Sequence, residues 1–382
     1  MEALTPFYEV NEALVAMGAE NLNLCMQCGL CAGSCPWRIV DGPFNIRQLI
    51  RMAQLGVEGY ESDDILYGCT TCNKCVLKCP RGVNIIDVVK AMRAMIAETG
   101  AIPGVLKTAT GSVHSNGNPW SEPREKRTAW MEGLDVPTFD EDKEYLLFVC
   151  CTSAYDARSQ NIAKAMVKVL TAAGISFGVI GEEESCCAES MRKIGDEELF
   201  MNTAGKNIKL YKEKGVKKVI TTSPHCFYTF SQEYPELGGE FEAIHYTQLL
   251  ANLLEEGKLK FSGTLDKKVT YHDPSYLGRH SEVYDAPRSL ISAVTGGNLV
   301  EMKNIKKDSI CCGAGGGRLW METPPEWRFS DLRIGEACET GASILASACP
   351  YCISMFEDSR KTTNKEDEIV IKDISELIAE VL

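Results

Sequence analysis

Most of the 18 cysteines in this 382-residue chain stand in groups whose spacing suits iron–sulfur chemistry. The pattern C-x2-C-x2-C-x3-C-P occurs twice near the N-terminus, at residues 25–36 and 69–80. In this spacing three thiolates of a run surround one cubane, and the fourth cysteine ligates the other cluster. A structural zinc site pairs two C-x2-C elements and needs neither the third cysteine nor the Cys-Pro step. The spacing therefore predicts two 4Fe-4S clusters.

The exchange of the fourth ligand divides these cysteines into two predicted ligand sets. One cubane is expected to bind Cys25, Cys28, Cys31 and Cys79, and the other Cys69, Cys72, Cys75 and Cys35. Clusters that exchange a ligand lie close together. Such an arrangement suits the relay of electrons and does not itself provide a substrate site.

The other ten cysteines lie in residues 144–382, where their spacing repeats. The candidate metal ligands are Cys151, Cys186, Cys187 and Cys226 in the first copy and Cys311, Cys312, Cys349 and Cys352 in the second. The copies are offset by 124 residues at Cys151 and Ser275, and by 126 residues at Ser223 and Cys349. This self-similarity indicates a tandem repeat in which each copy keeps four cysteines.

Alternating strands and helices are expected to position these cysteines. Strands are predicted at residues 145–149, 176–180 and 217–222 of the first copy and at 268–272, 298–302 and 342–346 of the second. Alternation of strands and helices predicts an α/β fold with largely parallel sheets. Ligand sites in such sheets lie beyond the carboxyl ends of the strands. Because each cysteine group follows a strand, each copy should gather its ligands at one sheet edge.

The chain divides into four predicted segments. Residues 1–105 form a helical two-cluster ferredoxin-type domain, with helices at 45–55 and 85–96, and residues 144–262 and 263–382 form the two repeats. Residues 106–143 hold no cysteine and are rich in Pro, Gly, Ser and charge. That composition predicts a connector draped over the surface.

Together these motifs resemble the D-type subunit of heterodisulfide reductases. The resemblance rests on the sequences Cys69-Thr70-Thr71-Cys72, Cys79-Pro80-Arg81-Gly82 and Cys311-Cys312-Gly313. It implies a helical two-cubane domain like that of the C-type subunit, fused to two tandem Rossmann-like α/β repeats like those of the B-type subunit, called CCG repeats. In the family each full repeat gives five cysteines to a non-cubane iron–sulfur cluster, and the paired clusters cleave a disulfide in two one-electron steps.

Three residues depart from the family pattern. Ser223 and Ser275 stand where the family has cysteines, and Ala188 replaces the glycine of the first CCG. A neutral hydroxyl is a weak iron ligand beside a thiolate. We therefore expect an electron-transfer subunit of an anaerobic oxidoreductase complex, with one or two further clusters at the repeats whose type the serines leave open. The alternatives are a catalytic heterodisulfide reductase and an electron-feeding subunit of a complex that reduces or oxidises acyl-CoA.

Some residues beside the predicted ligands carry further expectations. His225 and His272 are candidates for hydrogen bonding to a cluster or for proton transfer, with a structural hydrogen bond in a turn as the alternative. Cys150 and Cys338 are expected to be packing residues. The glycine-rich run at residues 313–317 is expected to let the backbone approach a cluster.

The composition of the chain limits where the protein can be located and which partners it can bind. The 40 Lys and Arg against 53 Asp and Glu give a net charge of −13, which argues against a nucleic-acid binder. No apolar run approaches the roughly 18 residues of a spanning helix, and no signal-peptide pattern is present. We expect a cytoplasmic protein, peripheral to a membrane only through a partner. Because no flavin, haem or nucleotide motif is present, we expect a flavoprotein, a ferredoxin or a membrane cytochrome or quinone-linked subunit as partner.

Overall fold

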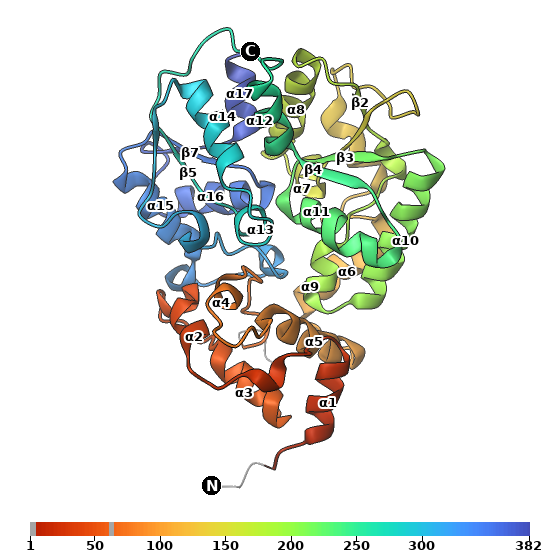
Figure 1. Ribbon diagram of the computed structural model, residues 1–382, viewed down its shortest axis with the longest axis vertical. Helices are drawn as coiled ribbons and strands as arrows, with labels where there is room; N and C mark the ends of the chain where they lie inside the picture. The colour runs from red at the N-terminus through yellow and green to blue at the C-terminus, as the bar shows by residue number, and fades with distance from the viewer. Residues whose placement is uncertain (1–4, 61–64) are drawn as a thin grey trace.

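The computed structural model describes residues 5–60 and 65–382. Figure 1 shows an N-terminal helical domain at one end of the molecule and two α/β units side by side at the other end. Each unit holds a four-stranded sheet in which every strand pair is parallel. The predicted fold class, a helical domain followed by two tandem α/β repeats, is confirmed.

The first repeat has the strand order β2-β1-β3-β4. Its strands are β1 (Tyr145–Phe148), β2 (Phe177–Gly178), β3 (Lys218–Thr221) and β4 (Glu242–His245). Its helices are α7 (Cys151–Tyr155), α8 (Gln160–Ala172), α9 (Glu189–Ile194), α10 (Glu197–Glu213), α11 (Pro224–Tyr228) and α12 (Tyr246–Glu255). Leu146, Leu147 and Phe148 are all buried, as expected where helices cover both faces of a parallel sheet.

The second repeat has the same order, β6-β5-β7-β8. Its strands are β5 (Val269–Tyr271), β6 (Leu299–Val300), β7 (Ile344–Ser347) and β8 (Val370–Asp373), and its helices are α13 (Ser275–Gly278), α14 (Asp285–Thr295), α15 (Phe329–Glu339), α16 (Pro350–Thr362) and α17 (Ile374–Glu380). The edge strands β4 and β8 were not predicted from the sequence; the first residue of each, Glu242 and Val370, is exposed.

The N-terminal domain is built on α1 (Tyr8–Ala16), α3 (Ile46–Leu55) and α5 (Ile85–Glu98). Asn45 and Asn84 cap α3 and α5, since each side-chain oxygen accepts a backbone N–H of the first turn. The short helices α2 (Leu30–Ser34) and α4 (Lys74–Leu77) carry the third cysteine of each run. The helices predicted at 45–55 and 85–96 are confirmed.

The prediction that residues 106–143 drape over the surface is wrong for much of that segment. Helix α6 (Gly104–Asn116) buries Leu106 and Val113, and a 3-10 segment (Arg124–Met131) buries Arg127 and Trp130. The Pro and Gly residues mark the ends of these elements. The segment is therefore part of the packed structure, and it delivers a cation to one of the sites described below.

The two repeats share one apolar core, which fixes their relative placement. Helices α8, α12, α14 and α17 pack against one another, and buried residues from both repeats join in one hydrophobic cluster. The carboxyl edges of the two sheets are thereby held close to each other and to the N-terminal domain.

Candidate iron–sulfur sites

The two N-terminal cysteine runs fold into loops of the same shape. Gln27 and Thr71 occupy matching positions and have positive φ angles of 59° and 51°. Gly29 and Asn73 also match, with φ angles of 84° and 68°. Glycine and asparagine tolerate the left-handed conformation best. These turns curl each loop so that its three thiols can surround a single cavity.

Each loop lines a cavity together with the last cysteine of the other run. One cavity is lined by Cys25, Cys28, Cys31 and Cys79, and the other by Cys35, Cys69, Cys72 and Cys75. Their empty volumes are similar, about 370 and 350 Å³. These are the two ligand sets that the spacing predicts, and the binding of iron by these residues stays a prediction.

The two cavities lie at different depths. Cys28 is exposed, and the apolar side chains of Met26 and Leu30 beside it are exposed as well. Cys69 and Cys72 are buried. The first cavity therefore reaches the surface, whereas the second is lined by thiols from the part of the N-terminal domain that contacts the second repeat.

The first repeat gathers its thiols at the carboxyl edge of its sheet. The Cys151 thiol interacts with that of Cys186, and the sulfurs of Cys187 and Cys226 are 3.5 Å apart. Interactions with Cys186 and Cys226 lower the pKa of the Cys187 thiol to about 7. The four predicted ligands of this repeat are therefore brought together.

Cys150 is buried in the core, as expected, and its thiol also lies among these cysteines. Strand β1 ends at Phe148, and Cys150 is the N-cap of α7, where its backbone N–H donates to Thr222 Oγ1 at 3.2 Å. Because the strand has ended, its alternation no longer sets the direction of this side chain. The Cys150 thiol interacts with Cys226, which lowers the pKa of Cys150 despite burial.

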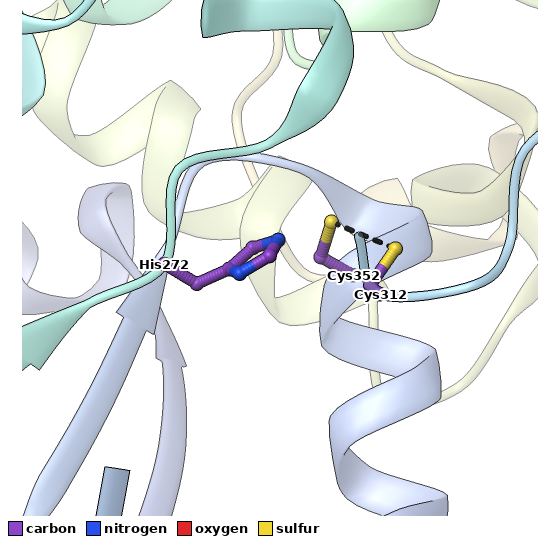
Figure 2. Close-up of side chains that lie close together, drawn as sticks. All are labelled: His272, Cys312 and Cys352. Atoms are coloured by element: carbon purple, nitrogen blue, oxygen red, sulfur yellow. Dashed lines mark hydrogen bonds between the residues drawn. The ribbon is translucent and has the colours of Figure 1, made fainter. Parts of the chain in front are cut away.

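The second repeat gathers four thiols and a histidine. Figure 2 shows the His272 ring pointing toward Cys312 and Cys352, whose sulfurs are 3.2 Å apart. A ring nitrogen and both sulfurs lie within 4.8 Å of one another. The thiols of Cys311 and Cys349 interact with those of Cys312 and Cys352, respectively.

Arg333 decides which nitrogen of His272 carries the proton. Arg333 Nε donates to His272 Nδ1 at 3.3 Å, so Nδ1 is an acceptor and the proton of the neutral ring is on Nε2. Burial, followed by the Arg333 cation, lowers the pKa of His272 well below its usual value, so the ring is neutral. Among the described residues, Nε2 of His272 has no hydrogen-bond partner. His272 therefore offers a hydrogen-bond donor to sulfur and no lone pair to a metal.

The two serines at family cysteine positions are buried and differ in their contacts. Ser275 Oγ accepts a hydrogen bond of 2.6 Å from Arg279. Ser223 Oγ has no partner among the residues that the structure describes. An unpaired buried hydroxyl costs free energy, which fits a site where a further group lies beside it.

The second N-terminal loop, residues 69–72, is embedded in the second repeat. Arg279 donates to the Cys72 carbonyl oxygen at 2.6 Å, and Thr71 Oγ1 lies 2.9 Å from the Tyr276 hydroxyl. The thiols of Cys72 and Cys311 interact, which raises the pKa of Cys72. The second N-terminal set and the second-repeat site therefore form one continuous group of sulfurs.

Two glycines of the 313–317 run lie close to protein backbone at this contact, and the approach of the run to a cluster stays a prediction. A Cβ at Gly315 would lie 2.3 Å from the Thr70 carbonyl oxygen, and one at Gly316 would lie 2.4 Å from that of Cys69. The fully buried Arg93 donates to the carbonyl oxygens of both Gly316 and Cys69. The glycines thus admit the backbone of the N-terminal loop.

His225 joins the two repeat sites. Its Nδ1 lies 3.2 Å from Glu189 of the first repeat, and its ring interacts with the Cys349 thiol of the second. Burial lowers the pKa of His225, but Glu189 and Cys349 outweigh burial and raise it to about 10. His225 is therefore a cation that lies between a carboxylate and a thiolate.

Buried arginines accompany the thiols, and sequence reasoning missed their role. Arg127 Nη1 lies 3.4 Å from Cys151 Sγ, and Arg127 forms a buried ion pair with Glu184 at 2.7 Å. A nearby guanidinium favours the thiolate form. Nothing in the local sequence around Arg127 distinguishes it from a surface arginine. Grouped thiols are the donor set that iron–sulfur clusters require.

Known proteins share this arrangement of domains. Residues 145–231 and 269–357 match the family described as "Cysteine-rich domain", and residues 21–83 match the "4Fe-4S dicluster domain". The D-type subunit of the dihydromethanophenazine:CoB–CoM heterodisulfide reductase of Methanosarcina barkeri is 33% identical over 97% of this chain and 96% of its own length. The chain belongs to the family of D-type heterodisulfide reductase subunits. Like the domains it matches, it carries several iron–sulfur clusters.

Two other relatives are longer than this chain. The probable iron–sulfur-binding oxidoreductase FadF of Bacillus subtilis is 36% identical over 84% of this chain, and the EtfAB:quinone oxidoreductase of Syntrophomonas wolfei is 34% identical over 82% of it. The chain spans only 47% and 46% of their respective lengths. Throughout residues 5–60 and 65–382, no helix combines the length and apolar character needed to cross a bilayer.

Proposed function

We propose that this chain is an iron–sulfur electron-transfer subunit of an anaerobic oxidoreductase complex. Iron–sulfur clusters supply one-electron transfer when they are bound. The chain contributes four groups of thiolates in a spatial order: the exposed N-terminal set, the buried N-terminal set, the second repeat and the first repeat. The observation that carries the proposal is the docking of the second N-terminal loop on the second repeat, where Arg279 donates to the Cys72 carbonyl oxygen and the Cys72 and Cys311 thiols are neighbours.

The contacts between neighbouring groups support this order. Cys31 of the exposed set lies close enough to Cys75 of the buried set to contribute to the raised pKa of the Cys75 thiol, which burial mainly causes. At the other end, Cys349 of the second repeat influences Cys150 of the first. The thiol of Cys311 thus links the buried N-terminal set to the second repeat, and Cys349 links the second repeat to the first.

The exposed N-terminal set is the proposed contact with a redox partner. Apolar side chains around it lie exposed at the surface, namely Leu24, Met26, Leu30 and Leu77. Clustered exposed apolar residues mark protein interaction surfaces. One relative is named for oxidising EtfAB with a quinone, so we propose an electron-transfer flavoprotein as donor. A ferredoxin is a second possible partner. A membrane cytochrome or quinone-linked subunit is a third, and a partner of that kind would hold the chain at the cytoplasmic side of a membrane.

The burial of the repeat thiols favours relay over disulfide cleavage. All nine, including Cys150, are 8% exposed or less. A disulfide substrate must bring a sulfur into contact with iron, whereas an electron needs only a short path between centres. Ser275 is tied to Arg279 and adds no fifth thiolate to the second repeat. A catalytic heterodisulfide reductase is therefore the second candidate.

The test compares electron transfer with thiol release in anaerobically prepared protein. A reduced electron-transfer flavoprotein should reduce the chain's clusters, followed by EPR, while the CoB–CoM heterodisulfide should release little thiol. Fast thiol release by the chain alone would reject the relay and establish the reductase. Failure of every partner class to reduce or oxidise the chain's clusters would also count against the relay.

A further inference from the structure

The two repeats place different residues at matching positions around their sites. Ser275 of the second repeat matches Cys151 of the first, so Pro274 matches Cys150. Ser223 of the first repeat matches Cys349 of the second. Each repeat therefore lacks one thiol that the other has. In addition, the first repeat has Cys150 where the second repeat has Pro274. Proline has no side-chain group that can ligate a metal.

The Cys150 thiol extends an unbroken series of sulfur contacts. Cys151 interacts with Cys186, and Cys186 interacts with Cys187. The Cys187 and Cys226 sulfurs are 3.5 Å apart, and Cys226 interacts with Cys150. All five thiols are buried. Cys338 also packs against a core, but no thiol of the described residues interacts with it, whereas Cys150 has the thiol of Cys226 as a neighbour.

The backbone holds Cys150 in this place. Its N–H donates to Thr222 Oγ1, the residue that precedes Ser223 at the end of β3. Position 150 after β1 and position 223 after β3 are therefore side by side at the sheet edge. Because β1 and β3 are paired in parallel, a side chain from either strand end can reach the same group.

We infer that Cys150 ligates the iron–sulfur cluster of the first repeat and supplies the thiolate that Ser223 does not. The inference rests on the proposed ligand set of that repeat. It makes the first repeat a five-thiolate site and leaves the second with four thiolates, so the two sites hold clusters of different coordination.

Substitution of Cys150 tests this assignment through metal content and spectra. Cys150→Ala should lose the first-repeat cluster or convert its EPR signal, while the signals of the two N-terminal cubanes persist. Cys150→Ser keeps the size of the side chain and should give the same spectral change without a folding defect. Cys338→Ala is the matched control and should retain the iron, sulfide and spectrum of the wild type. Wild-type iron and spectra in both Cys150 variants would overturn the inference.

Two further variants separate the possible failures. Cys226→Ala removes a predicted ligand from the same site, and iron content unchanged by it would show that the first repeat holds no cluster, which rejects both the ligand set and the role of Cys150. Ser223→Cys in the Cys150→Ser background should restore the lost signal, because it returns a thiolate to the neighbouring strand end. If this variant does not restore the signal, the Cys150 thiolate does not take the place of a ligand at position 223. None of these readouts depends on electron transfer to a partner.

Discussion

The two repeats have the same strand order and share one core, yet they hold different sites. The first gathers five thiols beside the Arg127 guanidinium. The second gathers four thiols beside the neutral ring of His272, and one of the four also meets Cys72 of the N-terminal domain. In both repeats the carboxyl edge of the sheet positions the thiols. The residues that follow the strands decide which other groups lie beside those thiols.

The segment after each Cys-Cys pair shows how this difference arises. In the first repeat Cys187 is followed by Ala188 and the helix α9 (Glu189–Ile194). In the second repeat Cys312 is followed by the glycine-rich run 313–317, into which residues 69 and 70 fit. One repeat closes its site with a helix, and the other leaves room for the loop of a neighbouring domain.

The largest effect is expected from removing the thiol that lies between the N-terminal domain and the repeats. Cys311→Ala should lose the second-repeat cluster and also leave the first-repeat cluster unreduced by a partner donor. Cys186→Ala, its counterpart, should lose only the first-repeat cluster. EPR after reduction by the donor measures both. Normal reduction of the first repeat in Cys311→Ala would show that electrons do not pass through the second repeat.

The next effect concerns Arg127, the cation beside the Cys151 thiol of the first repeat. Arg127→Met leaves Glu184 buried without its partner, which should destabilise the protein by about 3–5 kcal/mol in anaerobic denaturant unfolding. It should also lower the reduction potential of the first-repeat cluster, because loss of a positive charge disfavours the reduced state.

The double variant Arg127→Met/Glu184→Gln is the control for this prediction. It should recover much of the stability, because no buried charge is left unpaired, but it should keep the lowered potential. A potential that stays at the wild-type value in both variants would mean that Arg127 has a structural role alone.

A smaller effect is expected from a side chain added at Gly316, where the second repeat leaves room for residues 69 and 70. Gly316→Ala would place a Cβ 2.4 Å from the Cys69 carbonyl oxygen, at a φ of +65°. We expect a loss of about 1–3 kcal/mol relative to Gly341→Ala, which has a φ of +66° and no close contact. Equal unfolding free energies for the two variants would show that the loop is not tightly held. The comparison at equal φ removes the backbone penalty shared by both.

The smallest effect is expected from the ring of His272. His272→Phe removes the Nε2–H donor and should alter the EPR signal and lower the potential of the second-repeat cluster, with the first-repeat cluster unchanged. His272→Gln keeps an N–H donor and should shift the potential less. Loss of the cluster's iron in His272→Phe would contradict the donor role and identify the ring as a ligand.

Much of the architecture followed from local patterns. Cysteine spacing within the two N-terminal runs predicted the two sets that line separate cavities, since the shape of such a loop depends on the few residues between the thiols. The offset between the copies predicted the tandem repeat, and alternating apolar segments predicted six of the strands. Residues such as Cys186 and Cys187 carry their own signal, because adjacent cysteines are suited to neighbouring metal ions.

The sequence by itself determined which cysteines stand in groups and predicted the sheet edges where they gather, because these depend on residue type and spacing along the chain. Only the tertiary structure decided which groups meet across long separations. Cys150 joins the thiols because β1 ends before it, and Arg127 reaches Cys151 because the segment before the sheet folds inward. The thiol of Cys72 meets Cys311 because the glycine loop admits a distant backbone. Such contacts depend on the packing of whole domains, which no local pattern in the chain encodes.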